Sequence, residues 1–172
     1  AAKKAAGAIP IVLVLAADPV GAGLVKSLAR PGGNVTGLSQ MSLELAGKRL
    51  ELLKEMIPKL FRVAVLWNPQ GTVSPLAWKE IQLPARKLGL QLHSLEVRSS
   101  KDFDKVFEDA TRARAGAVFI LQDPLIVTNL KRIAGLVAKN HLPSMHYDSI
   151  FADAGGLMSY GPDRADMFRR AG

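Results

Sequence analysis

The sequence predicts an α/β protein built on a parallel, doubly wound sheet. Short apolar runs alternate along the chain with longer amphipathic segments, which is the strand–helix rhythm of such folds. Several of these runs end at Asp-Pro or Asn-Pro, the turn chemistry expected where a buried strand stops. A hydrophobic content of 48% with 22% charged residues is ordinary for a packed domain and too apolar for disorder. The 172 residues suffice for one sizeable domain or for parts of two smaller lobes.

Short apolar runs bounded by Gly, Pro, Asn or Asp are predicted to be the strands of this sheet. They cover residues 9–17, 34–39, 62–67, 90–97, 115–121, 142–147 and 156–160. The first run ends at Asp18-Pro19, the third at Asn68-Pro69 and the fifth at Asp123-Pro124. Right-handed crossovers would bring the carboxyl ends of all these strands to one edge of the sheet.

Segments with apolar residues at helical spacing are predicted between the strands. They cover residues 20–29, 42–57, 74–88, a stretch beginning at 102, and 125–139. Arg30-Pro-Gly-Gly is expected to end the first helix, and Ser42 is expected to cap the second, which stops at Pro58. Pro84 lies inside the third helix, where it is expected to kink or divide it.

Polar side chains stand at the predicted strand ends. They are Asp18, Thr36, Asn68, Asp123, Tyr147 and the pair Ser159-Tyr160. Proline follows three of them and fixes the direction in which each side chain is presented. Ligands of open α/β sheets bind beyond the carboxyl ends of the strands, so the set predicts a polar small-molecule site. For any one of these residues, an Asp or Asn before Pro can also serve only to cap its own backbone.

The basic balance of the chain does not indicate nucleic-acid binding. The formal net charge is +8 and the pI is near 10.0, but the 23 Lys and Arg residues are scattered. A nucleic-acid surface needs basic residues gathered with stacking or reading groups. The chain has no Cys, which excludes disulfides, thiolate catalysis and Cys-based zinc sites. No apolar run reaches the roughly 18 residues that a membrane span needs.

Motifs for catalysis are missing or incomplete. The stretch 21–23, Gly-Ala-Gly, follows a strand, but Lys26 stands where the third glycine of a dinucleotide-binding turn belongs. No GxSxG nucleophile elbow occurs. His93, His141 and His146 form no HExxH pattern and are expected to be ordinary surface or strand-end residues. We therefore predict no catalysis, no cofactor and no metal site.

Three long segments resemble one family of proteins. They are IPIV…DPVGAGLVKSLARPGGNVTG between residues 9 and 37, AGKRLELLKEMIPKLFRVAVLWNP over 46–69, and AGGLMSYGPD over 154–163. In order and spacing they are similar to the substrate-binding proteins of ABC transporters of the tryptophan/tyrosine type. The resemblance implies the two-lobed type 1 periplasmic-binding fold. It also implies a non-enzymatic receptor that closes around a small solute and presents it to a membrane permease.

The resemblance further implies how the chain is divided. Residues 1–38 would end a first-lobe segment, 39–160 would form the second lobe, and 161–172 would cross back toward the first. Members of the family are nearly twice as long, so this chain would hold one nearly whole lobe and part of the other. It would then lack the full clamshell site unless another chain supplied the missing strands, and the truncated chain could self-associate. Receptors of this kind are periplasmic, or extracellular and lipid-anchored.

Roles for single residues follow from the resemblance, position by position. Asp18 matches the first-lobe carboxylate of the DPV motif, where it could hold a ligand ammonium by a charge-assisted hydrogen bond. Asn68 and Asp123 match second-lobe positions at the NP and DP turns facing the cleft. Ser159 and Tyr160 lie in the GGLMSYG motif near the lobe crossing.

The solute and the cellular context stay open at this point. The subfamily implies an amino acid, aromatic or other, whereas pocket polarity alone would also admit sugars or small acids. Tyr147 could stack on an aromatic solute or simply pack. The alternative function is a ligand-sensing module of a signalling protein or transcriptional regulator with the same fold.

Overall fold

The computed structural model describes residues 6–171 of the chain. They form two compact units, one of residues 43–161 and the other of residues 6–42 with 162–171. Residues 1–5 and 172, at the outer ends of the predicted lobe segments, lie outside the described residues. The assignment of the two units to the lobes of a receptor stays a prediction.

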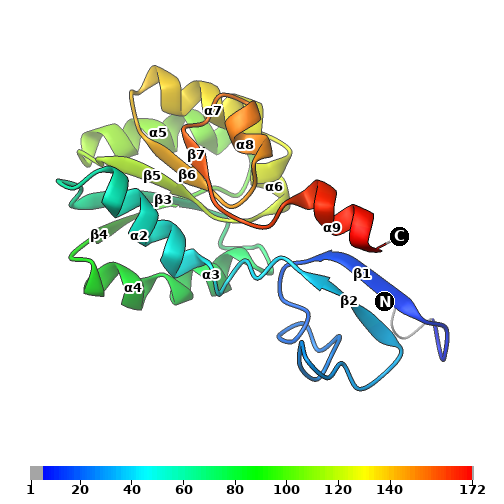
Figure 1. Cartoon of the computed structure of the whole chain (residues 1–172). Coiled ribbons are helices and arrows are strands. Elements are labelled where there is room, and N and C mark those ends of the chain that lie inside the picture. The colour runs from blue at the N-terminus through cyan, green and yellow to red at the C-terminus, as the bar shows by residue number, and fades with distance from the viewer. Residues whose placement is uncertain (1–5, 172) are drawn as a thin grey trace. The chain divides into compact units, whose positions relative to one another are not determined.

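The larger unit is a parallel sheet with helices on both faces (Figure 1). Its strands, in the spatial order β4-β3-β5-β6-β7, are Gln91–Glu96, Arg62–Trp67, Ala117–Ile120, Ser144–His146 and Met158–Ser159. Its α-helices are α2 (Ala46–Met56), α3 (Ser74–Glu80), α4 (Gln82–Lys87), α5 (Phe103–Arg112), α6 (Pro124–Val127), α7 (Leu130–Lys139) and α8 (Ile150–Asp153). The 3₁₀ turn η1 (Ser100–Asp102) leads into α5.

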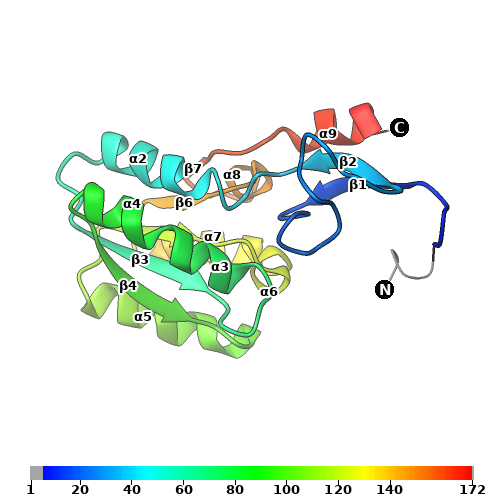
Figure 2. The ribbon, with the colours of Figure 1, turned by 90° about the horizontal axis from the view of Figure 1, so that it is seen from below.

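Alternation along the central strand β3 creates two hydrophobic cores, one on each face of the sheet. Val63 and Val65 pack with α2, α3 and α4, whereas Ala64 and Leu66 pack with α5, α6, α7 and α8. Successive side chains of a strand point to opposite faces, so a strand buried on both sides must be apolar throughout. Figure 2 shows these two helical layers with the sheet between them.

The smaller unit contains the parallel pair β1 (Ile11–Ala16) and β2 (Val35–Ser39), with Ile11 opposite Val35. Helix α9 (Arg164–Ala171) packs on this pair and buries Met167. The side-chain amide of Asn34 ties the entry of β1 by donating to the carbonyl oxygens of Gly7 (2.9 Å) and Ile9 (2.7 Å).

The predicted strands are confirmed, since each apolar run contains one observed strand and all pairings are parallel. The predicted helix over 20–29 is wrong, because this stretch forms turns. Gly23 adopts a left-handed conformation with φ of 65°, and the Asp18 carboxylate accepts the N–H of Gly21 at 2.7 Å. Val20 and Leu28 are 42% and 48% exposed, so little apolar burial is gained that could offset the poor helix propensity of two glycines.

The other helices differ from prediction mainly at their ends. Helix α2 begins at Ala46, so Ser42 is not its N-cap. The expected division near Pro84 is confirmed, with α3 and α4 meeting at Ile81. The predicted helix over 125–139 is split into α6 and α7, because Thr128 and Asn129 bond back to carbonyls of the preceding turn. Helices α8 and α9 were not predicted.

Residues 6–171 also lack two features that would bear on function. No helix among them is both long and apolar enough to cross a membrane. Within the same residues, no group of three or more His, Asp or Glu side chains is placed to hold a metal ion.

Candidate functional site

The carboxyl edge of the larger sheet contains a topological switch point. Strand β3 lies between β4 and β5, so the chain leaves β3 toward one side of the sheet and returns on the other. The loops after β3 and β5 therefore diverge, and ligands of open α/β sheets bind in the crevice that such divergence creates. Asn68 directly follows β3, and Asp123 lies just past the end of β5.

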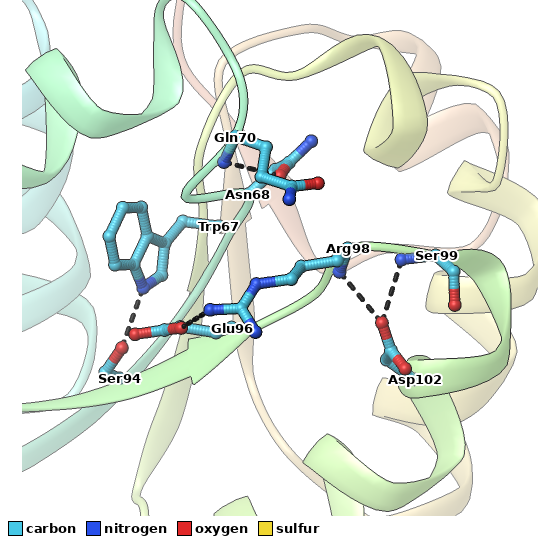
Figure 3. A network of polar contacts seen from close by, with 8 residues as sticks. All are labelled: Trp67, Asn68, Gln70, Ser94, Glu96, Arg98, Ser99 and Asp102. Carbon is cyan, nitrogen blue, oxygen red and sulfur yellow. Dashed lines mark hydrogen bonds and ion pairs between the residues drawn. The ribbon is translucent and has the colours of Figure 1, made fainter.

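Asn68 and Asp123 are joined across this switch point. The Asn68 Nδ2 atom donates to Asp123 Oδ1 at 3.2 Å, although the two residues are 55 positions apart. The same Oδ1 accepts the N–H of Leu125 at 2.9 Å, which makes Asp123 the N-cap of α6. Asn68 Oδ1 accepts the N–H of Gln70 at 2.9 Å and closes its own turn (Figure 3). The pair thus stabilises the two turns and also links the ends of two strands.

The two residues differ in accessibility. Asp123 is only 2% exposed, whereas Asn68 is half-buried. Gly71 presses against the carboxylate, since a Cβ at Gly71 would lie 2.2 Å from Asp123 Oδ2. A primary amide has two N–H donors and an oxygen with two lone pairs, so Asn68 keeps one donor and one acceptor position beyond its two hydrogen bonds.

A second polar cluster lies at the ends of β6 and β7. Arg49 of α2 is 4% exposed, and its Nε donates to the carbonyl oxygen of Tyr160 at 2.7 Å. The Arg49 guanidinium carbon also lies 6.0 Å from the centre of the Tyr147 ring. Burial lowers the pKa of Arg49 to about 10, against smaller opposing effects of Tyr147 and Tyr160. Arg49 thus remains a cation at neutral pH and fixes the segments that carry both tyrosines.

His146 extends this cluster into the core. It is the last residue of β6 and is fully buried, with its ring 4.4 Å from that of Tyr147 and 5.3 Å from that of Phe151. Its Nδ1 accepts the N–H of Asp148 at 3.2 Å. Burial lowers the pKa of His146 to about 4, and the positive charge of Arg49 acts in the same direction. The imidazole is therefore neutral at pH 7.

A third polar group lies past the end of β4 (Figure 3). Arg98 donates to Glu96 at 3.2 Å, and Asp102 accepts the main-chain N–H groups of Arg98 and Ser99, each at 2.8 Å. These two bonds lower the pKa of the Asp102 carboxyl. Asp102 and Ser99 form a capping box at the start of η1, the turn that leads into α5, so this group needs no ligand to explain it.

The smaller unit holds the remaining predicted site residues. Asp18 follows β1, is half-buried, and accepts the N–H of Gly21. A Cβ at Gly21 would lie 1.9 Å from Asp18 Oδ2, so the glycine permits the carboxylate to close this turn. Thr36 is not at a strand end as predicted. It is the second residue of β2, paired with Val12, and therefore lies near the amino end of that strand.

The structure therefore brings some of the predicted residues together and leaves others apart. Asn68 contacts Asp123, and Tyr147 and Tyr160 meet through Arg49. Ser159 is the last residue of β7, opposite His146 in the register. Surface cavities of about 440, 470 and 410 Å³ lie elsewhere, beside α5, α7 and α4.

Sequence reasoning missed Arg49. Arg49 sits in an amphipathic helix between Lys48 and Leu50, where a cation is normally solvated. Its position on the apolar stripe, three residues after Ala46 and four before Leu53, was the available signal. His146 was expected to be an ordinary surface or strand-end residue; it is the strand-end residue of β6 and is fully buried.

A doubly wound parallel sheet with polar side chains gathered over its switch point defines a ligand-binding α/β domain. The sequence comparison then gives the family. The chain belongs to the ABC transporter substrate-binding proteins, whose family model matches residues 1–172. The resemblance noted in the sequence is thereby confirmed.

Individual relatives agree with this family. The chain is similar to a tyrosine-binding protein of Clostridioides difficile (strain R20291), with 28% identity over 100% of this chain and 49% of that protein. It is also similar to an ABC domain of Streptococcus pneumoniae solved in complex with L-Trp. That match has a TM-score of 0.80 and 26% identity, over 94% of this chain and 55% of the other.

A conserved domain protein of Vibrio cholerae O1 biovar El Tor has a TM-score of 0.83 and 26% identity to this chain. The match covers 94% of this chain and 54% of the Vibrio chain. The fold is thus that of the periplasmic-binding proteins. The chain spans about half the length of the relatives it matches.

Proposed function

We propose that this chain is part of the solute-binding receptor of an ABC importer, which captures an amino acid between two lobes and delivers it to a membrane permease. Family membership supports this role. Relatives that are described as binding tyrosine or are solved with L-Trp support an amino acid, and an aromatic one in particular. The structural observation that carries the proposal is the Asn68–Asp123 bridge over the switch point of the larger sheet.

In this proposal the two members of the bridge have different tasks. Asp123 is buried and its Oδ1 is held by two donors, so it positions Asn68 and caps α6. Asn68 binds the solute with the donor and acceptor that its turn leaves over. Tyr160, whose carbonyl oxygen Arg49 holds, is 41% exposed and supplies an aromatic surface that a solute with a ring could contact, whereas Tyr147 is only 6% exposed and packs beside Arg49.

The smaller unit would contribute Asp18 to the proposed set. Asp18 would bind the ammonium of an amino acid there, through a charge-assisted hydrogen bond. Thr36 and Ser159 complete the proposed set, with weaker support, because Thr36 lies near the amino end of β2 and Ser159 lies within β7.

The receptor would work outside the cytoplasmic membrane, in the periplasm or on a lipid anchor, where it meets its permease. The matched relatives are described as binding proteins, which supports a receptor without catalytic activity. Family membership also favours transport over the alternative role as a sensing module.

The test is a thermal-unfolding screen of the receptor, expressed from its full-length gene, against the common L-amino acids. A true solute stabilises the folded state by about 2.7 kcal/mol when its concentration is about 100 times Kd. We expect L-Tyr or L-Trp to raise the Tm. If no amino acid raises it while a sugar or small acid does, the proposed solute class is wrong. The present chain alone, as a monomer, is expected to bind far more weakly.

Matched variants locate the binding contact. Asn68→Ala is expected to weaken solute binding at least tenfold. Gln70→Ala is the control, two residues further along the same turn. Gln70 bonds to Asn68 only through its main-chain N–H, so loss of its exposed side chain should leave affinity unchanged. Quenching of the fluorescence of Trp67, which directly precedes Asn68, is an independent readout of binding. Equal affinities of both variants would contradict a direct role of Asn68.

A further inference from the structure

The two edges of the larger sheet are unlike. At one edge, β7 is only two residues long, whereas at the other, β4 has six. Natural proteins protect sheet edges by shortness, proline, bulges or charged side chains, since an open edge can pair with another chain. Strand β7 is protected by its length, and β4 is not.

The outward-facing backbone of β4 can be assigned from its bonds to β3. Gln91 and Val97 donate their N–H groups to Phe61 (2.7 Å) and Trp67 (2.9 Å) on the β3 side. Backbone groups of alternate residues in a parallel strand point to opposite sides. The N–H and C=O groups of Leu92, Ser94 and Glu96 therefore point away from the sheet.

Few of the usual protective features are present on β4. The strand QLHSLE contains no proline, and its one charged residue is Glu96 at the end, where Arg98 neutralises it at 3.2 Å. Ser94, at the middle, is exposed. A strand of this length and composition at an open edge is predicted to be an association site.

There is also space along this edge. A cavity of about 440 Å³ lies beside β4 and α5, lined by Ser94 and Glu96 of the strand and by Lys105 and Asp109 of the helix. Leu92 packs in the same core as Trp67, whose indole N–H donates to Ser94 Oγ at 2.7 Å (Figure 3). Trp78 stacks on Trp67 with ring centres 5.2 Å apart. Half-buried apolar side chains thus flank the open strand.

We propose that β4 pairs with β4 of a second copy of this chain, antiparallel, across a two-fold axis at Ser94. In this register Ser94 faces Ser94 of the second copy, and Leu92 faces Glu96 of the second copy. The outward-pointing residues of each strand thus bond to one another, in the same way in both chains.

Two physical arguments favour a second copy over an unrelated peptide. With a two-fold axis perpendicular to the sheet, the same face of both copies lies on the same side of the combined sheet. The apolar groups Leu92, Trp67 and Trp78 of both copies therefore meet on one face. In addition, Glu96 lies opposite Leu92 and not opposite another Glu96, so no like charges face each other directly. The contact is isologous and closes with two chains.

The register predicts which single cysteine forms a cross-link. The chain has no Cys, so Ser94→Cys and Glu96→Cys each introduce one thiol. In the Ser94→Cys dimer the two thiols would face each other across the axis, within the roughly 7 Å Cα separation that a disulfide permits. In the Glu96→Cys dimer they would be offset along the strands by about 13 Å. We expect Ser94→Cys to give a disulfide-linked dimer under mild oxidation, at least tenfold faster than Glu96→Cys.

Sedimentation of the unmodified chain tests the association directly. We expect the weight-average mass to rise from that of one chain toward that of two as concentration increases. The proposal is wrong if the chain stays monomeric at all accessible concentrations. It is equally wrong if the monomer binds extended peptides of other proteins in place of a second copy. Equal cross-linking of the two cysteine variants would also overturn it.

Proline variants distinguish loss of edge pairing from loss of folding. Ser94→Pro removes an outward N–H and keeps the bonds from β4 to β3, so the monomer should fold while dimer formation is lost. Ser100→Pro is the matched control, placed at the first position of η1 after the extended residue Ser99, where proline is tolerated. Dimerisation of Ser94→Pro at the strength of Ser100→Pro would contradict the proposal. If Ser94→Pro does not fold, the cysteine pair decides.

Discussion

Asn68 and Asp123 at the ends of β3 and β5 bond to the backbone of their own turns, whereas Arg49, Tyr147 and Tyr160 meet from three distant parts of the chain. Both groups lie at the carboxyl edge of one sheet. In the first, each side chain has a local partner, Gln70 for Asn68 and Leu125 for Asp123. In the second, the Arg49 side chain reaches across 111 positions to the carbonyl of Tyr160.

The two groups hold their shape in different ways. A turn residue is held largely by local bonds, so replacing one member of the Asn68–Asp123 bridge is expected to cost the other only their shared hydrogen bond. A buried arginine is kept in place only by the packed fold, and the segments it joins lose their common anchor when it is removed. The larger effects of substitution should therefore fall on the Arg49 cluster.

The strongest way to break this cluster is Arg49→Ala. The substitution leaves the Tyr160 carbonyl without its donor and removes the side chain that packs beside Tyr147. We expect a loss of about 3–4 kcal/mol in the free energy of unfolding, measured by urea denaturation. Lys48→Ala is the control on the same helix, because Lys48 is exposed and pairs only with exposed carboxylates. Equal losses for the two variants would contradict the role given to Arg49.

The pH dependence of stability tests the same cluster, because His146 changes its protonation state in the acidic range. Its pKa is about 4 in the folded state and 6.5 for the free side chain, so the unfolded chain binds a proton first as the pH falls. Stability should therefore decrease between about pH 6.5 and pH 4, by up to about 3 kcal/mol from this residue. The measurement is the unfolding free energy by urea at several pH values in this range.

His146→Asn is the matched variant for this prediction. The Asn oxygen can replace Nδ1 as the acceptor for the N–H of Asp148 and does not titrate. Its stability should change less between pH 6.5 and pH 4 than that of the unmodified chain. An identical pH profile for both proteins would show that His146 is not the group responsible.

The contrast between the two clusters also explains what the sequence could predict. The strands were predicted because apolar runs between turn residues are a local signal. Asn68 and Asp123 were found for the same reason, as residues before proline at strand ends. Arg49 was missed, because its burial depends on the approach of β6 and β7 from far along the chain.

The errors have similar physical causes. The stretch 20–29 has helical spacing, but Gly23 turns left-handed and the apolar side chains find little to bury against. Thr36 lies inside both the predicted strand over 34–39 and the observed β2 (Val35–Ser39), so its place among the strand ends did not follow from the strand boundaries. Helix α9 does have a local signal, since Asp163 accepts the N–H of Asp166 at 3.1 Å as an N-terminal cap would, and this signal was overlooked.

The smallest effects should separate the two members of the local bridge. Asp123→Ala removes the N-cap of α6 and the acceptor for Asn68, and we expect a loss of about 2 kcal/mol. Asn68→Ala removes a half-buried amide and should reduce stability by about 1 kcal/mol. Because the two side chains are bonded at 3.2 Å, the double variant should lose less than the sum, with a coupling of about 0.5–1 kcal/mol. Additive losses in urea denaturation would mean that each turn stands alone and that the bridge contributes nothing to the edge it spans.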